Sequence, residues 1–531
     1  MTADEPRLPE NYRHIPERVN ICREVLDKTL ETISPDWPAF VWDDGSLSYV
    51  ELAARVKTVA AGFGAHGVER GTPVVVRMSN CVEFAVTFLA LTRIGALPVL
   101  QNSLLGEEEV AYVIDHSSAR AAVTLDPIAE PLRRLASNLD LGLIVARGAL
   151  DGEIAFESLL EFDGDATPAD TEADEPAFMV YTSGTTGRPK GIVHGHRWVI
   201  ALGDSNRWRV PVEPDDVALA TGEWSFISAL GHNVLFPLRN GVTGAILEGR
   251  AGPEAVLGAI ERHRVTVFYS VATVYRRILA MDGVEARFDL SSLRGCNATG
   301  EALEETTWRE FKTRIGCDIW EHYGVSEMQM VLGQGPRFPV RPGSIGLPIP
   351  GTRIAVLDDD YKELAAGQVG HFLIAADNPG FFLGYHRDPD KTAEVVHDGW
   401  YHTGDLAWRD EDGYFRIAGR SDDCFKSRGI FISPYEIENA LRGHRAVAEA
   451  CVVALPDREI GNRIRAVVVP REGFAESPEL AEEIRASLRE RIAPYKTPHL
   501  VEFVDALPKS PVGKVLRRQI AAQFRIIDNG F

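Results

Sequence analysis

The 531-residue chain is poor in cysteine and in basic residues, and it has no long apolar run. Its six cysteines are scattered without a CxxC pair, which argues against a zinc framework or a disulfide-stapled fold. The 56 Lys and Arg are outnumbered by 77 Asp and Glu, giving a net charge of −21. Nucleic-acid binders and proteins of anionic membrane surfaces usually carry a basic face. We therefore expect neither nucleic acid nor a membrane as a partner.

The N-terminus is charged and proline-rich rather than apolar, so it does not indicate a secretory signal. The most membrane-like stretch, 84–91, is too short to cross a bilayer. A cytoplasmic location is the expectation. At roughly 100–200 residues per domain, the length indicates three or more packing units. The hydrophobic share of 45% is typical of a globular protein and argues against disorder.

Helix and strand patterns alternate over the first 150 residues. Ser48-x-x-Glu51 is a capping box that opens a predicted helix over 49–62, and Asn80 is predicted to cap a second helix. Buried strands are predicted at 73–78, 97–100 and 119–125. This alternation indicates parallel βαβ layers covered by helices.

The pattern changes twice further along the chain. A second αβ series has predicted strands at 177–181, 265–269 and 317–323, and from about residue 344 the sequence is β-rich. After residue 420 an α+β unit is predicted, with a helix start near 434, strands at 448–455 and 464–469, and a helix at 478–492. The predicted class is α/β. A large N-terminal domain, 1–421, would combine αβα layered subdomains with a β-rich subdomain, and 422–531 would form a small mobile α+β domain.

One apparent motif can be set aside. The segment Gly62-Phe-Gly64-Ala-His-Gly67 fits the dinucleotide pattern GxGxxG. That fingerprint follows a strand and opens a helix. Here the segment follows a predicted helix and precedes a predicted strand, so helix termination by glycine explains it.

The strongest motif is Tyr181-Thr-Ser-Gly-Thr-Thr-Gly-Arg-Pro-Lys190-Gly191, directly after a predicted strand. Glycines let backbone N–H groups turn inward as an anion nest, and the hydroxyls add further donors. Arg188 and Lys190 supply positive charge. Pro189 stands where a Walker A loop requires glycine, so the motif indicates a phosphate-binding loop of another kind.

Through this loop the chain resembles the superfamily of AMP-forming, adenylate-forming enzymes, which includes acyl- and aryl-CoA synthetases, amino-acid adenylation domains and luciferases. The resemblance spans nearly the whole chain. Four later segments match the family in order, namely Tyr323-Gly-Val-Ser-Glu327, Tyr401-His-Thr-Gly-Asp405, Gly419-Arg420-Ser-Asp422-Asp423 with Gly429, and Pro508-Lys-Ser-Pro-Val-Gly-Lys514.

The resemblance implies ATP, Mg²⁺ and coenzyme A as ligands. Glu327 would bind Mg²⁺, because hard cations prefer carboxylate oxygens. Asp405 would accept the ribose hydroxyls, with help from Arg420, and Gly429 would let the backbone pass beside the coenzyme A arm unless it is only a turn glycine. The other implied nucleotide-binding residues are Thr182, Ser183, Gly184, Thr185, Thr186, Gly187, Lys190, Gly300, Glu301, Ala302, His322, Tyr323, Gly324 and Ser326.

The resemblance also implies a reaction in two halves. A carboxylate attacks the α-phosphate of ATP, giving acyl-AMP and pyrophosphate. The C-terminal domain then rotates about Asp422, and coenzyme A takes the acyl group. Lys514 is the implied catalytic lysine, with Glu327 and Thr182 as further catalytic residues. A mobile ammonium offsets the repulsion between two anions at the moment of attack.

The acid pocket is implied to include the segment 223–241. Its tail, LFPLRNG, resembles the benzoate and 2-aminobenzoate CoA ligase branch, as does 428–438. His232 departs from the small or amide residue expected there, and it either hydrogen-bonds a ring substituent or is a packed histidine. The full set of predicted acid-binding residues is Phe226, Gly231, His232, Tyr269, Ala298 and Tyr323, with Val271 beside them.

Several functions remain open at this point. An aromatic acid is favoured, with a medium-chain or alicyclic acid as the alternative. A stand-alone amino-acid or aryl-acid adenylation enzyme is a further alternative, although Glu223 is not followed by the aspartate that would pair with an α-ammonium group. Two further alternatives are a luciferase-type oxidative activity and an inactive relative that only binds nucleotide. A monomer or a homodimer is expected.

Overall fold

The structure is a computed structural model that describes residues 12, 14–164, 166–182, 188–213, 215–249, 251–428, 430–457, 459–509 and 515–527. Several predicted site residues lie outside these ranges, namely Ser183, Gly184, Thr185, Thr186, Gly187, Gly429 and Lys514. Their roles stay predictions.

The first layered unit is built on an eight-stranded sheet in the order β19-β9-β8-β4-β3-β5-β6-β7. The strands from β8 to β7 run parallel, while β9 and β19 are antiparallel additions at one edge. The bounds are β3 (Pro73–Arg77), β4 (Leu97–Leu100), β5 (Ala121–Leu125), β6 (Gly142–Ala146), β7 (Ile154–Ala155), β8 (Pro176–Thr182), β9 (Lys190–Gly195) and β19 (Gly384–Tyr385).

Helices cover both faces of this sheet. Alternate residues of β3 divide between two cores: Val74 and Val76 belong to one and Val75 to the other. The first core is shared with α2 (Tyr49–Ala65) and α3 (Val82–Arg93), and the second with α4 (Glu107–Ser117) and α5 (Glu130–Arg134). The predicted αβα layering is confirmed.

A second layered unit contains a nine-stranded sheet in the order β16-β15-β14-β13-β12-β10-β11-β1-β2. Its bounds are β1 (Pro38–Trp42), β2 (Gly45–Ser48), β10 (Val217–Ala220), β11 (Thr243–Ala245), β12 (Val267–Ser270), β13 (Gly295–Ala298), β14 (Ile319–Val325), β15 (Met328–Gly333) and β16 (Leu347–Pro348). The strands β1, β11, β10, β12, β13 and β14 are parallel neighbours.

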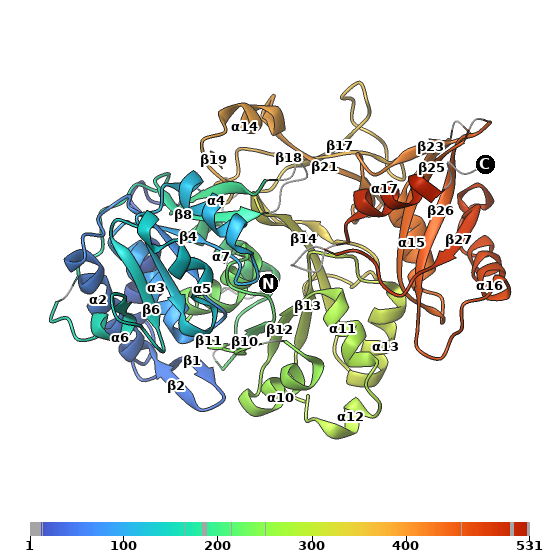
Figure 1. Ribbon diagram of the computed structural model, residues 1–531. Coiled ribbons are helices and arrows are strands. Elements are labelled where there is room, and N and C mark those ends of the chain that lie inside the picture. The colour runs from blue at the N-terminus through green and yellow to red at the C-terminus, as the bar shows by residue number, and fades with distance from the viewer. Residues whose placement is uncertain are drawn as a thin grey trace.

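The two faces of the second sheet meet different helices. One core joins it to helices that Figure 1 shows below the sheet, α10 (Pro253–His263), α11 (Ala272–Leu279) and α13 (Glu305–Ile315). The opposite face shares the core of the first unit through α7 (Trp198–Arg209), α8 (Ile227–Leu230), a π-helix η4 (Gly231–Leu235) and α9 (Phe236–Arg239). This shared core fixes the two sheets relative to each other.

The β-rich region predicted from about residue 344 forms a five-stranded sheet, β17-β18-β21-β20 with β22 on β21. It lies above the junction of the first two units in Figure 1, with the short helix α14 beside it. The bounds are β17 (Ile354–Leu357), β18 (Gly370–Ala375), α14 (Pro389–Val395), β20 (Val396–His397), β21 (Trp400–Arg409) and β22 (Phe415–Arg420).

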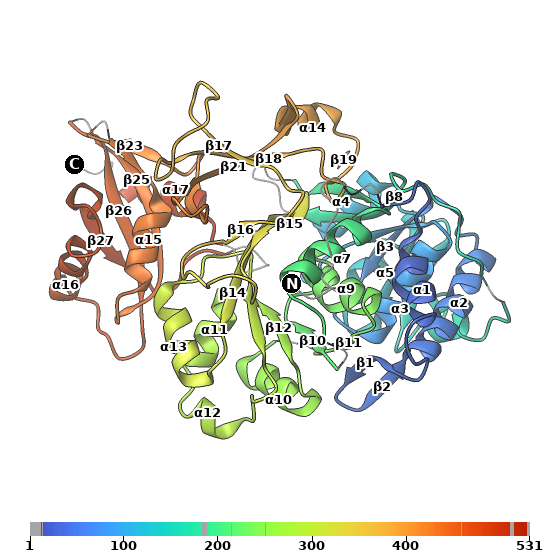
Figure 2. The ribbon, with the colours of Figure 1, turned by 180° about the vertical axis from the view of Figure 1, so that it is seen from behind.

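The C-terminal residues form a smaller α+β domain with its own core, which begins at Ile432. Figures 1 and 2 both show it at one end of the molecule, away from the first sheet. The division at 421/422 and the mobility of this domain stay predictions. Its elements are β23 (Phe425–Ser427), β24 (Ile430–Ile432), α15 (Pro434–Arg442), β25 (Val447–Asp457), β26 (Gly461–Pro470), α16 (Pro478–Arg489), β27 (Leu500–Phe503) and α17 (Arg517–Ile527).

Two predicted helix starts have different outcomes. Ser48 and Glu51 form the predicted reciprocal capping box at the start of α2. The prediction for Asn80 is wrong, because α3 begins after Cys81 and has no side-chain cap. The Asn80 side chain instead donates to the Gly222 carbonyl at 2.9 Å and accepts from the Trp224 amide at 2.8 Å. A distant loop therefore takes the polar group that the helix start would have used.

The glycine-rich segment 62–67 is the end of a helix, as predicted. Gly62 and Gly64 lie inside α2, and Gly67 follows it with a positive φ of 82°. Among the described residues, no helix combines the length and the apolar character that crossing a bilayer requires.

Candidate active site

The turn between β14 and β15 is the centre of the site. The predicted segment Tyr323 to Glu327 covers the last three residues of β14 and this turn, and a register shift in the β14–β15 pairing accompanies it. Gly324 is required there: a Cβ on this residue would lie 1.6 Å from the carbonyl oxygen of Gln329. Since that neighbour is backbone, only glycine lets the two strands approach this closely.

Glu327, at the end of this turn, is almost fully buried but is not alone. Its Oε1 accepts from Lys190 Nζ at 2.9 Å and from the Tyr385 hydroxyl at 2.5 Å. Burial by itself would raise the pKa of Glu327, but the Lys190 ammonium and the Tyr385 hydroxyl outweigh it and hold that pKa below its ordinary value. The carboxylate is therefore ionised at neutral pH.

Three distant segments meet at Glu327. Lys190 begins β9, where it lies opposite Thr182 of β8 across the antiparallel pair. Tyr385 ends β19, and the Lys190 ammonium also lies 4.3 Å from the centre of its ring. The phosphate-loop motif is thereby connected to the turn at 323–327, as the prediction for Lys190 and Glu327 requires.

The other end of the same turn meets a second carboxylate. The Tyr323 hydroxyl donates to Asp405 Oδ2 at 2.5 Å, and Arg420 Nη1 lies 3.3 Å from Asp405 Oδ1. Asp405 and Arg420 face each other across the β21–β22 pair. Burial raises the pKa of Asp405, although Arg420 and the Tyr323 hydroxyl partly offset it.

Two flanking predictions are placed near this turn. The backbone carbonyl of Ser326 accepts from His194 Nε2 at 3.0 Å, which fixes the turn to β9. Gly300 adopts a positive φ of 82° directly after β13, and the carboxylate of Glu301 accepts from the Thr273 amide. The segment 300–302 thus lies past the carboxyl end of a parallel strand, where open α/β sheets bind ligands.

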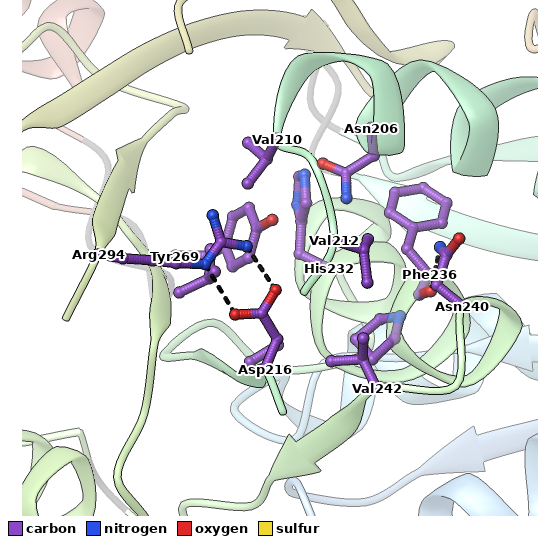
Figure 3. Close-up of a pocket in the computed structure, with 13 residues that line it drawn as sticks. Asn206, Val210, Val212, Asp216, His232, Phe236, Asn240, Val242, Tyr269 and Arg294 are labelled. Carbon is purple, nitrogen blue, oxygen red and sulfur yellow. Dashed lines mark hydrogen bonds and ion pairs between the residues drawn. The ribbon is translucent and has the colours of Figure 1, made fainter. Parts of the chain in front are cut away.

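The predicted acid-binding residues divide into two groups. His232 of η4 and Tyr269 of β12 stack with ring centres 4.2 Å apart, and both line a small pocket of about 30 Å³. Figure 3 shows the two rings with Asn206 beside them and the Asp216–Arg294 ion pair at the rim. Phe226, Gly231, Ala298 and Tyr323 do not line this pocket.

Sequence profiles of two protein families match the chain. The profile described as AMP-binding enzyme matches residues 30–386, and the one described as AMP-binding enzyme C-terminal domain matches residues 436–514. The chain belongs to the AMP-binding enzyme family.

Relatives of this family cover nearly the whole chain. Benzoate–CoA ligase of Thauera aromatica is 34% identical over 522 residues, 97% of this chain and 98% of that protein. 3-Hydroxybenzoate–CoA ligase of Aromatoleum sp. (strain CIB) is 32% identical over 94% of this chain and 95% of that protein. The crystal structure of the anthranilate CoA ligase AuaEII with anthranoyl-AMP matches with a TM-score of 0.91 and 28% identity, covering 98% of this chain and 100% of that one.

These comparisons confirm the predicted adenylate-forming family and the mixed α/β fold with a smaller C-terminal domain. Within this AMP-binding enzyme, the structure brings together two predicted groups: Lys190 with Glu327, and Tyr323 with Asp405 and Arg420. The predicted hinge residue Asp422 follows them and lies 3.3 Å from Arg420. The roles of these residues stay predictions.

Two other predicted residues, His322 and Ala298, have defined surroundings, and their roles stay predictions. His322, expected beside the nucleotide, has its ring centre 5.0 Å from that of His232. Ala298 packs in the core under α11 and α13, on the sheet face opposite His232 and Tyr269. Its neighbour Asn297 is the residue of β13 on the His232 side, since successive side chains of a strand point to opposite faces.

Sequence reasoning missed four residues that contact the site. Tyr385 hydrogen-bonds to Glu327, and His194 hydrogen-bonds to the Ser326 carbonyl of its turn. Arg209 and Asn297 hydrogen-bond to each other. None belongs to a motif that the family resemblance had supplied. Tyr385 is the last residue of the segment Phe-Leu-Gly-Tyr, whose glycine could have signalled a constrained turn. In the structure this glycine has a positive φ of 144°.

Proposed function

We propose that the chain is an ATP-dependent carboxylate–CoA ligase that forms an acyl-adenylate and then an acyl-CoA thioester on an aromatic acid. One observation carries this proposal: a single short segment, 323–327 at the end of β14, holds two separate carboxylate sites. Asp405 is hydrogen-bonded at the Tyr323 end, and Glu327 is paired with Lys190 at the other. A nucleotide has ribose hydroxyls and charged phosphates at a fixed separation, and it requires both.

Asp405 is the ribose site. A carboxylate accepts hydrogen bonds and donates none, which suits the two hydroxyls of a ribose. The Tyr323 hydroxyl and Arg420 hold its two oxygens in place. Such charge-assisted hydrogen bonds are the strong ones, so this group contributes much of the affinity for ATP.

Glu327 and Lys190 form the phosphate site. Among the described residues, no group of three His, Cys, Asp or Glu side chains is placed to hold a metal ion. The single ionised carboxylate of Glu327 nevertheless fits Mg²⁺, which is usually bound by one or two carboxylates together with substrate phosphates. Bound there, Mg²⁺ would neutralise phosphate charge. Lys190 would exchange part of its pairing with Glu327 for phosphate oxygens.

The first half-reaction joins two anions. An oxygen of the acid forms a bond to the α-phosphorus, and the bond from that phosphorus to pyrophosphate breaks. Lys514 is the proposed cation between the two, because an ammonium on a flexible stem can follow the charge as it develops. In the second half, the thiolate of coenzyme A attacks the acyl carbon and AMP leaves.

Rotation about Asp422 would separate the two halves. In the structure Arg442 of α15 pairs with Glu304, just before α13, at 3.0 Å. Asp422 itself is half-exposed and touches Arg420. A rotation at this point would break the Arg442–Glu304 pair and leave Asp405 and Arg420 in the large domain. The hinge would then be a few residues long, as in other domain closures.

An aromatic acid is favoured for two reasons. The relatives described above are named for benzoate, 3-hydroxybenzoate and anthranilate. The rings of His232 and Tyr269 also present flat faces beside the predicted acid-binding segment. A flat ring packs well against such faces, with centres about 4.5–7 Å apart.

Pyrophosphate release across a panel of acids tests this function. The panel holds benzoates, medium-chain acids, alicyclic acids and amino acids, each with ATP and with or without coenzyme A. Benzoates should release pyrophosphate, and an aryl-CoA should form only when coenzyme A is present. If no acid of the panel triggers pyrophosphate release, the enzyme assignment is refuted. Release with amino acids alone would refute the CoA ligase.

The Lys514→Ala variant tests the mechanism. It should lose acyl-adenylate formation by about 100-fold or more, since removing one preorganised donor of this kind costs 10²–10³ in rate. Lys362→Ala is the matched control, because that lysine is exposed and its ammonium lies beside surface Asp360. Full acyl-adenylate formation by Lys514→Ala would contradict the proposed role.

A further inference from the structure

A cluster of buried polar side chains includes His232 of the predicted acid-binding segment. Its members are 3% exposed or less, and each has a polar atom with no hydrogen-bond partner among the described residues. Buried polar atoms are almost always satisfied, so this many in one place calls for a ligand or for water. The atoms are Arg209 Nη2, His232 Nε2, Asn297 Nδ2, both ring nitrogens of His322 and Gln329 Oε1.

These side chains are contiguous. The rings of His232 and His322 have centres 5.0 Å apart, and Arg209 Nη1 donates to Asn297 Oδ1 at 2.7 Å. Gln329 Nε2 donates to the Ser228 carbonyl at 3.2 Å, beside His232. They come from α7, η4, β13, β14 and β15, and they share the side of the sheet where Tyr269 stacks on His232.

The cluster is positively charged, with neutral imidazoles. Arg209 has no acidic partner among the described residues, and burial lowers its pKa only to about 10, so it stays protonated. Burial, with Arg209 adding to it, lowers the pKa of His232 to about 3 and that of His322 well below its ordinary value. Both rings are therefore uncharged at neutral pH.

The hydrogen-bond roles follow from the partners. His232 Nδ1 has two close neighbours, the Ser228 carbonyl at 2.9 Å and the Gln329 amide nitrogen at 3.1 Å. The carbonyl can only accept and is the nearer, and the Gln329 amide also donates to it, so we assign the proton to Nδ1. In this neutral ring Nε2 is then an acceptor. Asn297 Nδ2 and Arg209 Nη2 can only donate. The cluster thus offers an acceptor and donors close together, which is the complement of a hydroxyl group.

We propose that this cluster selects an aromatic acid that bears a ring hydroxyl, with His232 accepting its proton and Asn297 or Arg209 donating to its oxygen. This inference rests on the function proposed above. A hydroxyl would displace the water expected at such a site and reproduce that water's hydrogen bonds. Unsubstituted benzoate would leave the buried groups unpaired, and sites built for a hydroxyl reject the analogue that lacks it by large factors.

The wild-type enzyme with Mg²⁺, ATP and coenzyme A provides the first test. Steady-state pyrophosphate release is measured with benzoate, 3-hydroxybenzoate, 4-hydroxybenzoate and 4-methylbenzoate. At least one hydroxybenzoate should exceed benzoate in kcat/KM by about 100-fold or more. The methyl compound, which has the size of a hydroxyl but cannot hydrogen-bond, should be no better than benzoate. The two hydroxy isomers distinguish which ring position faces the cluster.

The His232→Phe variant provides the second test, because it keeps a ring against Tyr269 and removes the acceptor. The preference for hydroxybenzoate over benzoate should fall to about 10-fold or less, through loss of the hydroxy acid and gain of benzoate. His66→Phe, an equivalent change beside Phe162, is the control and should keep the preference. A uniform loss with all acids would assign His232 a structural role only.

The failures of the two proposals are distinguishable. If benzoate equals both hydroxybenzoates in the wild-type enzyme, the hydroxyl inference is wrong and the aromatic ligase stands. If no aromatic acid releases pyrophosphate but another class of acid does, both are wrong. The wild-type comparison decides the inference even if His232→Phe does not fold.

Discussion

Replacing Gly324 by alanine should distort the turn on which both carboxylate sites depend. The added Cβ would lie 1.6 Å from the Gln329 carbonyl oxygen and 2.2 Å from its carbon. Real Cβ contacts stay beyond 3.0 Å, so the oxygen must retreat by about 1.4 Å. It cannot do so alone, because β14 and β15 are paired on both sides of Gly324, at Tyr323 and at Val325. We expect a loss of about 3 kcal/mol, the upper end of the usual cost of overpacking.

Two assays separate the consequences of Gly324→Ala. Thermal unfolding should show a midpoint lowered by roughly 3 °C. Pyrophosphate release should fall more steeply, since about 1 Å of misplacement can cost 100-fold in rate. The control is Gly258→Ala in α10, where a Cβ meets nothing within 4 Å. It should stabilise by about 0.5–1 kcal/mol. Native stability and activity in Gly324→Ala would refute the close approach described here.

Three further predictions concern buried carboxylates. Burial would raise the pKa of Glu327, but Lys190 and Tyr385 outweigh it and lower that pKa below 4.5. The stability that the ionised carboxylate gives is therefore full at neutral pH and is lost as the pH falls through that pKa. In urea unfolding, Glu327→Gln should be less stable than the wild type at neutral pH, and this difference should close below pH 4.5. Burial raises the pKa of Glu321 to about 8, so between pH 4.5 and 8 the folded state keeps a proton that the unfolded state has lost. The free energy of unfolding should therefore fall as the pH rises through this range, and Glu321→Gln should weaken that dependence. Asp405→Ala should raise the KM for ATP at least about 10-fold, because it loses hydrogen bonds of about 1.5–3 kcal/mol each, and an unchanged KM would contradict the ribose assignment.

Local patterns predicted much of the fold because they agree with its long-range pairing. The strand at 97–100 was predicted with the bounds that the structure has, since a short buried run flanked by turns permits few alternatives. The Ser48 capping box needs only residues within one turn, and it was correct. Asn80 shows the limit of this reasoning. Its partners at 222–224 are brought near by the tertiary fold, and no window around residue 80 contains them.

Site residues could be predicted where a motif names them. They could not be predicted where the side of the strand that a residue occupies determines its surroundings. Glu327 and Lys190 were each named from a motif, and the ion pair between them is a finding of the structure. Asn297 and Ala298 are neighbours in β13, but they point to opposite faces of the sheet. Ala298 packs in the hydrophobic core, whereas Asn297 belongs to the buried polar cluster, so a shift of one residue changes the surroundings completely. Arg209, near the end of α7, carries no signal in its own segment that it would be buried against Asn297.

The nucleotide product of the complete reaction is the most direct test of an adenylate-forming CoA ligase. The enzyme is incubated with Mg²⁺, ATP, coenzyme A and a hydroxybenzoate, and nucleotides and thioesters are separated by chromatography. AMP and aryl-CoA should appear in equal amounts, and AMP should not accumulate when the acid is left out. Formation of ADP, or of AMP without a thioester, would contradict the account given for Asp405, Glu327 and Lys514.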